Sequence, residues 1–236
     1  MGAARIQAPT RASPLPVAAT VPTLRGMSDT AETESRLVAA LWQVVAAHGW
    51  EGLTMARVAA ASGLSLAELR RRCPSRLHLL RLHGLAMDRA ALEGSEFGGS
   101  SPRDRLFDAL MRRIDAMQPH RAGIVRLLEE LRRDPLLALL LLAELPGSMS
   151  WMLEAAGIAT GGLPGLLRVQ GTTGVWLATI RAWLKDDSQD LGRTMAALDR
   201  ALDQAERVAR TLRLGPGTAP VASGHNDIIA ASQQKL

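Results

Sequence analysis

The residues best suited to chemistry are arginines gathered in one short stretch. Between positions 57 and 89 stand seven arginines against two acids, a surplus of five that equals the net charge of +5 of the whole chain. Guanidinium groups focused in this way favour a polyanion such as nucleic acid, because they neutralise phosphates and release counterions. A solvated surface that binds nothing is the alternative explanation of the same charge.

The residue types give little support to other chemistries. The single cysteine, Cys73, excludes an intramolecular disulfide and favours a reducing compartment, so we expect a cytoplasmic protein. His78 and His83 are five residues apart and on a helix would point away from each other, unlike a pair of metal ligands. No GxSxG, Walker or HExxH motif occurs. We therefore expect no enzyme activity, no metal and no cofactor.

Two short helices are predicted around the arginines. Thr54 suits the N-cap of a helix that ends at Gly63, and Ser65 with Glu68 forms a capping box that opens the next helix. The turn between them has the length and the glycine of a helix-turn-helix unit, although a plain three-helix bundle would use the same turn as a connection. In such units the second helix enters the major groove of double-stranded DNA. The corresponding residues are Ser65, Leu66 and Ala67 at the tip, and Arg70, Arg71, Arg72, Ser75 and Arg76 around the phosphate backbone.

The hydrophobic pattern predicts an all-α protein. The chain is 47% hydrophobic but only 3% aromatic and has no tyrosine, which suits Ala/Leu-rich helices better than strands. We expect about nine helices, arranged as a three-helix head and a larger helical bundle. The expected parts are a disordered N-terminal extension (1–30), a helix-turn-helix DNA-binding domain (31–92), a helical body (101–213) and a flexible tail (214–236).

The N-terminal stretch and the longest apolar run bear on targeting. Four prolines before residue 23 break any long amphipathic transit helix, and no continuous apolar segment suggests a signal peptide. Translation from Met1 or from Met27 fits the sequence equally. The run from Leu136 to Leu142 is too short for a membrane span, so we expect a buried core helix and no integral membrane segment.

Two long helices near the C-terminal end each carry an apolar stripe. They are expected over about 164–185 and 190–213. In the second, apolar residues recur at intervals of four and three, as the packed face of a helix requires. The stripe residues are Leu191, Met195, Leu198 and Leu202, with Trp183 on the preceding helix.

Residues 36–83 resemble the N-terminal domain of the TetR family of bacterial transcriptional regulators. The similarity lies in the Gly-aromatic-x-Gly-x-Thr step at 49–54, the ASGLS turn and the Pro-Ser-Arg that follows the short helix. Where the family usually has Tyr, Phe and Lys, this chain has Arg70, Cys73 and Arg76. The resemblance implies a TetR-like fold, contact of DNA by the helix 65–72 and by Thr54 and Arg76, and a homodimer.

The same resemblance implies that the body, residues 101–213, is a ligand-binding and dimerisation domain. The homodimer would form through the last two helices, with Trp183, Leu191, Met195, Leu198 and Leu202 at its interface. A small apolar effector would bind in the body and release the DNA. The candidate pocket residues are Trp151, Met152, Trp176 and Ile180, and plain core or dimer packing is the alternative role of each.

A second resemblance covers the body. The stretches 111–128, 150–157 and especially 175–202 are similar to TetR-fold lipid-binding accessory proteins of ubiquinone biosynthesis, which do not bind DNA. This resemblance implies an isoprenoid lipid as ligand, although a helix end, a polar turn and an Asp-capped helix also explain the acids at 186–190. The intact turn and the arginine surplus favour a DNA-binding regulator, which is the first hypothesis. The lipid-binding protein is the alternative, and a pure dimerisation or scaffold protein is the third.

Overall fold

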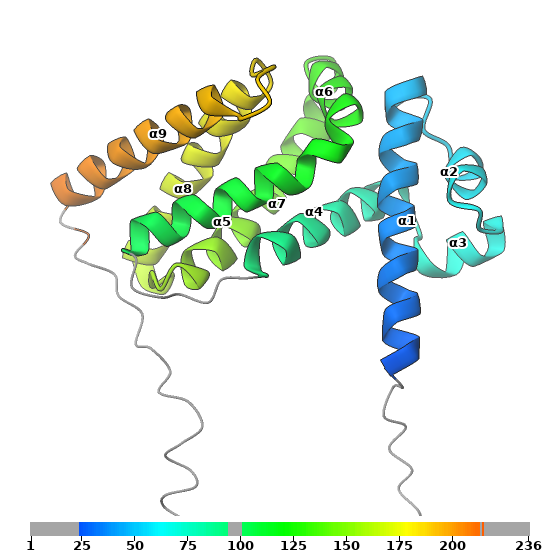
Figure 1. Cartoon of the computed structure of the whole chain (residues 1–236), viewed down its shortest axis with the longest axis horizontal. Coiled ribbons are helices and arrows are strands. Elements are labelled where there is room, and N and C mark those ends of the chain that lie inside the picture. The colour runs from blue at the N-terminus through cyan, green and yellow to red at the C-terminus, as the bar shows by residue number, and fades with distance from the viewer. Residues whose placement is uncertain (1–23, 94–100, 213, 215–236) are drawn as a thin grey trace, which may run out of the picture.

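The computed structural model describes residues 24–93, 101–212 and 214, and within these ranges the chain is all-α. Figure 1 shows α1 to α3 at one end of the molecule and α8 with α9 at the other. The predicted fold class is confirmed. The helices are α1 (Leu24–His48), α2 (Met55–Ser62), α3 (Leu66–Arg72), α4 (Arg76–Leu92), α5 (Pro102–Met117), the short 3₁₀-helix η1 (Gln118–His120), α6 (Arg121–Glu130), α7 (Pro135–Ala155), α8 (Gly162–Trp183) and α9 (Gly192–Thr211).

The caps predicted from the sequence set the ends of α2 and α3. The Thr54 side chain accepts a hydrogen bond from the backbone N–H of Arg57, and Gly63 ends α2 in the left-handed conformation that glycine adopts without strain. Ser65 accepts from the N–H of Glu68 and opens α3. The carboxylate of Glu68 bonds to arginines one turn later instead of closing the predicted capping box.

The N-terminal helix is longer than predicted. Residues 24–30 were expected to be disordered, but they form the first turns of α1. The last proline before α1 is Pro22, and nothing after it removes a helical N–H or blocks the preceding turn. Residues 1–23 of the predicted extension and 215–236 of the predicted tail lie outside the described residues.

The head and the body share one continuous core. Buried side chains of α1 such as Leu37, Leu41 and Val45 belong to the same hydrophobic cluster as those of the body. Helix α6 packs directly on α1, with Gly123 lying against the backbone of Trp42. The Arg126 guanidinium donates to the Ala46 carbonyl (2.9 Å) at the end of the same contact. The head is therefore fixed to the body through α1 and α6.

Helix α7 is not the buried helix that its sequence predicted. Of the run 136–142, only Leu137 is buried, while Leu136 and Leu139 are 66% and 64% exposed. By length and composition this helix could cross a membrane, with a mean hydropathy of 1.7 over 18 residues, of which 22% are buried. No other helix of the described residues meets that criterion. The apolar run packs on one side only, because the body supplies no neighbour for the other.

Candidate nucleic-acid interface

The residues predicted to contact DNA form an exposed surface around α3. The exposed residues are Thr54, Pro74, Ser75 and all of α3 except Leu69 and Glu68. Arg76 is partly buried. Leu69 and Cys73 are fully buried and fix α3 on the head. The exposed members of the predicted DNA-contacting set are therefore Thr54, Ser65, Leu66, Ala67, Arg70, Arg71, Arg72 and Ser75.

The arginines of α3 are held only by local contacts. Arg71 and Arg72 each bond to Glu68, at 3.3 Å and 3.1 Å, on the helix surface. Exposed pairs of this kind contribute little free energy, so the guanidinium groups can exchange Glu68 for a phosphate at small cost. Arg70 donates to the carbonyl of Pro74 (3.0 Å). The three groups are thus exposed cations on one short helix.

Arg76 has a structural contact that sequence reasoning missed. Its guanidinium lies over the Trp50 ring, 5.1 Å from the ring centroid, and donates to the Trp50 carbonyl at 3.1 Å. The backbone N–H of Trp50 in turn donates to Glu130 of α6 (2.7 Å). Arg76 therefore ties the start of α4 to the turn after α1, where the body also contacts the head.

Cys73 stands at the position where the TetR-family pattern usually has Phe. Its side chain is fully buried, and burial raises the pKa of the thiol, while a backbone hydrogen bond at Ser75 opposes that rise. A thiol with a raised pKa is a poor nucleophile and a poor metal ligand. Cys73 is a packing residue under α3.

The four residues predicted to line a pocket do not share one lining. Trp151 is 60% exposed, whereas Met152 and Trp176 are buried in the core and Ile180 is partly buried. A groove of about 1160 Å³ lies elsewhere, between the start of α5, the end of α7, α8 and α9, and none of the four residues lines it. Its apolar lining includes Leu106, Leu153, Ile158, Val175, Leu202 and Ala205.

The apolar stripes of α8 and α9 face each other within the chain. These two helices pack more extensively than any other pair, and Trp183, Leu198 and Leu202 are buried at 0–4% exposure. Leu191 is also buried, and Met195 is the exposed member of the predicted dimer set. Further exposed apolar positions of these two helices are Leu163, Leu166 and Leu177 of α8.

The body contains a buried polar group that no sequence motif indicated. Arg113 of α5 forms an ion pair with Asp88 of α4, and the Ser148 hydroxyl of α7 donates to the same carboxylate (2.7 Å). The guanidinium lies 5.0 Å from the ring centroid of Trp176, and burial lowers its pKa to about 10. This cluster joins four helices inside an otherwise apolar core.

A second buried polar contact links the head to the body. The Trp42 indole N–H of α1 donates to Nδ1 of His83 on α4 (3.1 Å), and the imidazole of His83 packs edge-on against that of His120. Burial lowers the pKa of His83 to about 3, so this imidazole is neutral and Nδ1 can accept the hydrogen bond from the indole N–H at any physiological pH.

The acids between α8 and α9 make a local turn. Asp186 accepts from the Ser188 hydroxyl (2.5 Å) and from the N–H and hydroxyl of Thr194 (both 2.7 Å), and it is 2% exposed. Hydrogen bonds from Ser188 and then from Thr194 hold the pKa of the Asp186 carboxyl well below its usual range. The hydrogen bonds of Asp186 are therefore those of a local turn between α8 and α9.

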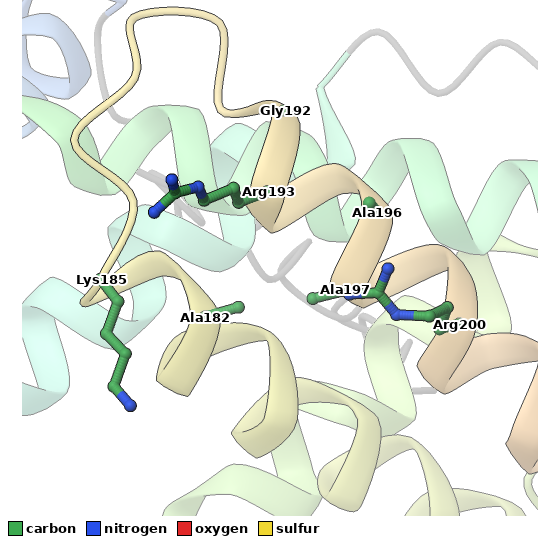
Figure 2. A pocket seen from close by; sticks show the side chains of 7 residues that line it. All are labelled: Ala182, Lys185, Gly192, Arg193, Ala196, Ala197 and Arg200. Carbon is green, nitrogen blue, oxygen red and sulfur yellow. The ribbon is translucent and has the colours of Figure 1, made fainter.

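The same turn borders a small cavity, which Figure 2 shows between the end of α8 and the start of α9. Its volume is about 470 Å³, and alanines and Gly192 form its floor. Lys185, Arg193 and Arg200 stand at its edge, but their charged groups point in different directions (Figure 2). Because the three cations do not converge, we assign no anion site to this cavity.

The role of Asp186 leads to a pH prediction. A carboxyl whose pKa is depressed by folding stabilises the protein above its unfolded pKa of about 4, and this contribution is lost as the pH falls toward the folded pKa. Asp186→Asn should therefore lower the thermal midpoint at neutral pH, and its difference from the wild type should shrink below about pH 4. Asp187→Asn, whose side chain is 96% exposed, is the control. Equal midpoints for both variants at neutral pH would contradict the role of the turn.

These features define a class of all-α protein, with a helix-turn-helix head fixed through α1 and α6 to a helical body. Solved structures of this class are similar to the chain. A TetR transcriptional regulator from Nitrosomonas europaea ATCC 19718 matches with a TM-score of 0.61 and 21% identity, over 75% of this chain and 99% of that one. One from Rhodococcus sp. RHA1 matches with a TM-score of 0.55 and 18% identity, over 75% and 97%.

The comparisons confirm the fold, and the function has to be inferred from the residues of the candidate site. At these identities the likeness establishes that the chain has the fold of the TetR regulators, as its N-terminal motif predicted. No protein-family model matches the chain, and no curated protein matches it significantly. The neighbours are described as regulators, so the likeness does not favour the alternative of a lipid-binding accessory protein.

Proposed function

We propose that this protein is a TetR-like transcriptional regulator that binds double-stranded DNA through the exposed surface of α3. The observation that carries the proposal is the exposed helix-turn-helix tip, Ser65 to Ala67, flanked by arginines paired only with a neighbour on the same helix. The tip would meet base edges in the major groove, and the arginines with Thr54 and Ser75 would hold phosphates. No catalytic role is proposed.

The proposed regulator acts as a homodimer. Two heads must lie about 34–36 Å apart, or a multiple of this, to contact successive major grooves on one face of DNA. Because most of the predicted stripe is buried within the chain, the proposed dimer face uses exposed positions of the same two helices. These are Leu166 and Leu177 of α8 and Met195 of α9.

The proposed effector is a small apolar molecule bound in the groove between α5, α7, α8 and α9. The groove volume of about 1160 Å³ exceeds that of a drug-sized ligand, and its lining is mostly apolar. An effector releases DNA only if it binds one arrangement of the heads better than the other. The contacts of α4 and α6 with α1 supply a physical connection from the body to the head.

DNA binding is tested by fluorescence anisotropy with duplexes from the region upstream of the protein's own gene, a scrambled duplex and two salt concentrations. Arg71→Ala/Arg72→Ala should weaken binding to the native duplex about tenfold or more and reduce the salt dependence, because two phosphate contacts are lost. Arg193→Ala/Arg200→Ala removes the same charge from α9 and should have little effect. Equal weakening by both variants, or equal affinity for the scrambled duplex, would refute sequence-specific binding through α3.

A further inference from the structure

The strongest unexplained feature of the surface is an apolar stripe along the whole of α7. Its members recur at helical spacing and all are exposed, so they lie on one side of the helix. On the opposite side Met149, Met152 and Leu153 are buried in the core. We call this surface the α7 stripe, and it consists of Leu136, Leu139, Leu140, Ala143, Gly147 and Trp151.

The exposed apolar surface continues from the α7 stripe onto α4. Helix α4 packs beside α7 and exposes Leu77 and Leu85, while Arg81 between them bonds to Glu144 of α7 at 2.6 Å. A monomeric protein rarely leaves so many large apolar side chains together in water, because each costs hydration free energy. We therefore expect this surface to be covered by a binding partner that is not part of the isolated chain.

Charge at the N-terminal end of the stripe indicates the occupant. Arg132 and Arg133 are exposed and make no ion pair within the described part of the chain. Asp134 separates them from α7, and its carboxylate is engaged as the N-cap, where it accepts from the N–H of Leu137 (2.9 Å). The two carboxylates of α7 are both engaged: Glu144 pairs with Arg81, and Glu154 accepts from Thr160 (2.7 Å). The stripe thus has arginines at one end, leucines along its length and Trp151 at the other.

We propose that the α7 stripe docks on the surface of an anionic lipid bilayer. Leucines would enter the boundary between headgroups and acyl chains, Trp151 would lie at the headgroup level, and Arg132 with Arg133 would pair with lipid phosphates. The helix lies on the bilayer and does not cross it, because its other side is packed in the core. A lipid surface needs no hydrogen-bonding partner on the stripe, whereas a specific protein interface usually supplies a polar rim.

This inference does not rest on DNA binding, and the two can be tested separately. The α7 stripe and the α3 surface belong to different helices and share no residue. A variant that loses vesicle binding should keep its DNA affinity. A failure of DNA binding in the wild-type protein would leave the vesicle experiment unaffected.

The test is co-sedimentation of the full chain with phosphatidylcholine vesicles, with and without phosphatidylglycerol. We expect binding to the anionic vesicles, and a blue shift of tryptophan fluorescence, because Trp151 is the exposed tryptophan while Trp42, Trp50, Trp176 and Trp183 are buried. Trp151→Phe should bind and lose the shift. Leu136→Gln/Leu139→Gln should weaken binding about tenfold or more. The control is Leu163→Gln on α8, at a residue 68% exposed, and it should bind as the wild type does.

Three results would overturn the proposal. The first is absence of wild-type binding to anionic vesicles, and the second is equal loss in the α7 and α8 variants, which would indicate unspecific apolar adhesion. The third comes from sedimentation velocity in the absence of lipid. If Leu136→Gln/Leu139→Gln converts a dimer into a monomer, the α7 stripe is an interface between two copies of the chain.

Discussion

Replacing Asp88 with alanine should lower the free energy of unfolding by about 3–5 kcal/mol, because it leaves the guanidinium of Arg113 buried without its partner. Arg113 is 5% exposed, and the remaining contacts of its charged group are with the Ser148 hydroxyl at 3.5 Å and with the Trp176 ring, whose centroid is 5.0 Å away. Urea unfolding of the full chain measures the change.

Two further variants separate the ion pair from its burial. Asp88→Leu/Arg113→Met removes both charges and should recover much of the lost stability, since an apolar pair of similar volume is often neutral in such a position. Glu144→Ala breaks the exposed pair with Arg81 and should cost less than about 1 kcal/mol. If Asp88→Ala costs no more than Glu144→Ala, the buried pair does not stabilise the body.

Replacing Gly123 with alanine should cost about 1–3 kcal/mol, because α6 approaches α1 too closely for a side chain. A Cβ at this position would lie 2.6 Å from the carbonyl oxygen of Trp42, which belongs to a helix and cannot turn aside. The two helices would have to separate at the contact between head and body. Urea unfolding of Gly123→Ala measures this cost.

The matched control for Gly123 is Gly84 in the interior of α4. A Cβ at Gly84 would meet no atom within 4 Å. Gly84→Ala should therefore raise stability by about 0.5–1 kcal/mol, because alanine loses less conformational entropy than glycine in a helix. The same substitution thus has opposite signs at two helical glycines. A stabilising Gly123→Ala would show that α1 and α6 are not held at this distance in solution.

Local signals in the sequence predicted the helix-turn-helix correctly. Thr54, Gly63 and Ser65 act within one turn of the residues they cap, so their effect does not depend on the rest of the fold. For this reason the observed limits of α2 and α3 agree closely with the expected ones. The structure has a further local cap of this kind at the start of α5, where Ser101 and Asp104 form a capping box.

Periodicity could not identify which surface an apolar stripe contacts. Leu198 and Leu202 have the spacing of a packed face, and they pack on α8 of the same chain. Leu136 and Leu139 are equally apolar and remain exposed. The partner of each stripe depends on the arrangement of helices distant in sequence, which spacing does not encode.

Side-chain pairs that are remote in sequence could not be predicted at all. Trp42 and His83 are 41 residues apart, and Arg113 meets Asp88 and Ser148 from three separate helices. None of these residues stands in a motif. The same reason explains why the groove lining differs from the four predicted pocket residues.

The length of α1 has a mechanical consequence. At about 1.5 Å per residue its 25 residues form a rod of about 37 Å. The body grips the rod near Trp42 and Ala46, while Arg36, nearer its free end, holds the last turn of α2 through the Ser62 carbonyl (2.5 Å). Because α6 holds α1 near Ala46, a slight tilt of α1 at this contact displaces its N-terminal end further than the residues at the contact. A small tilt of α1 at its contact with α6 would therefore move the end of α2 further than it moves Trp42.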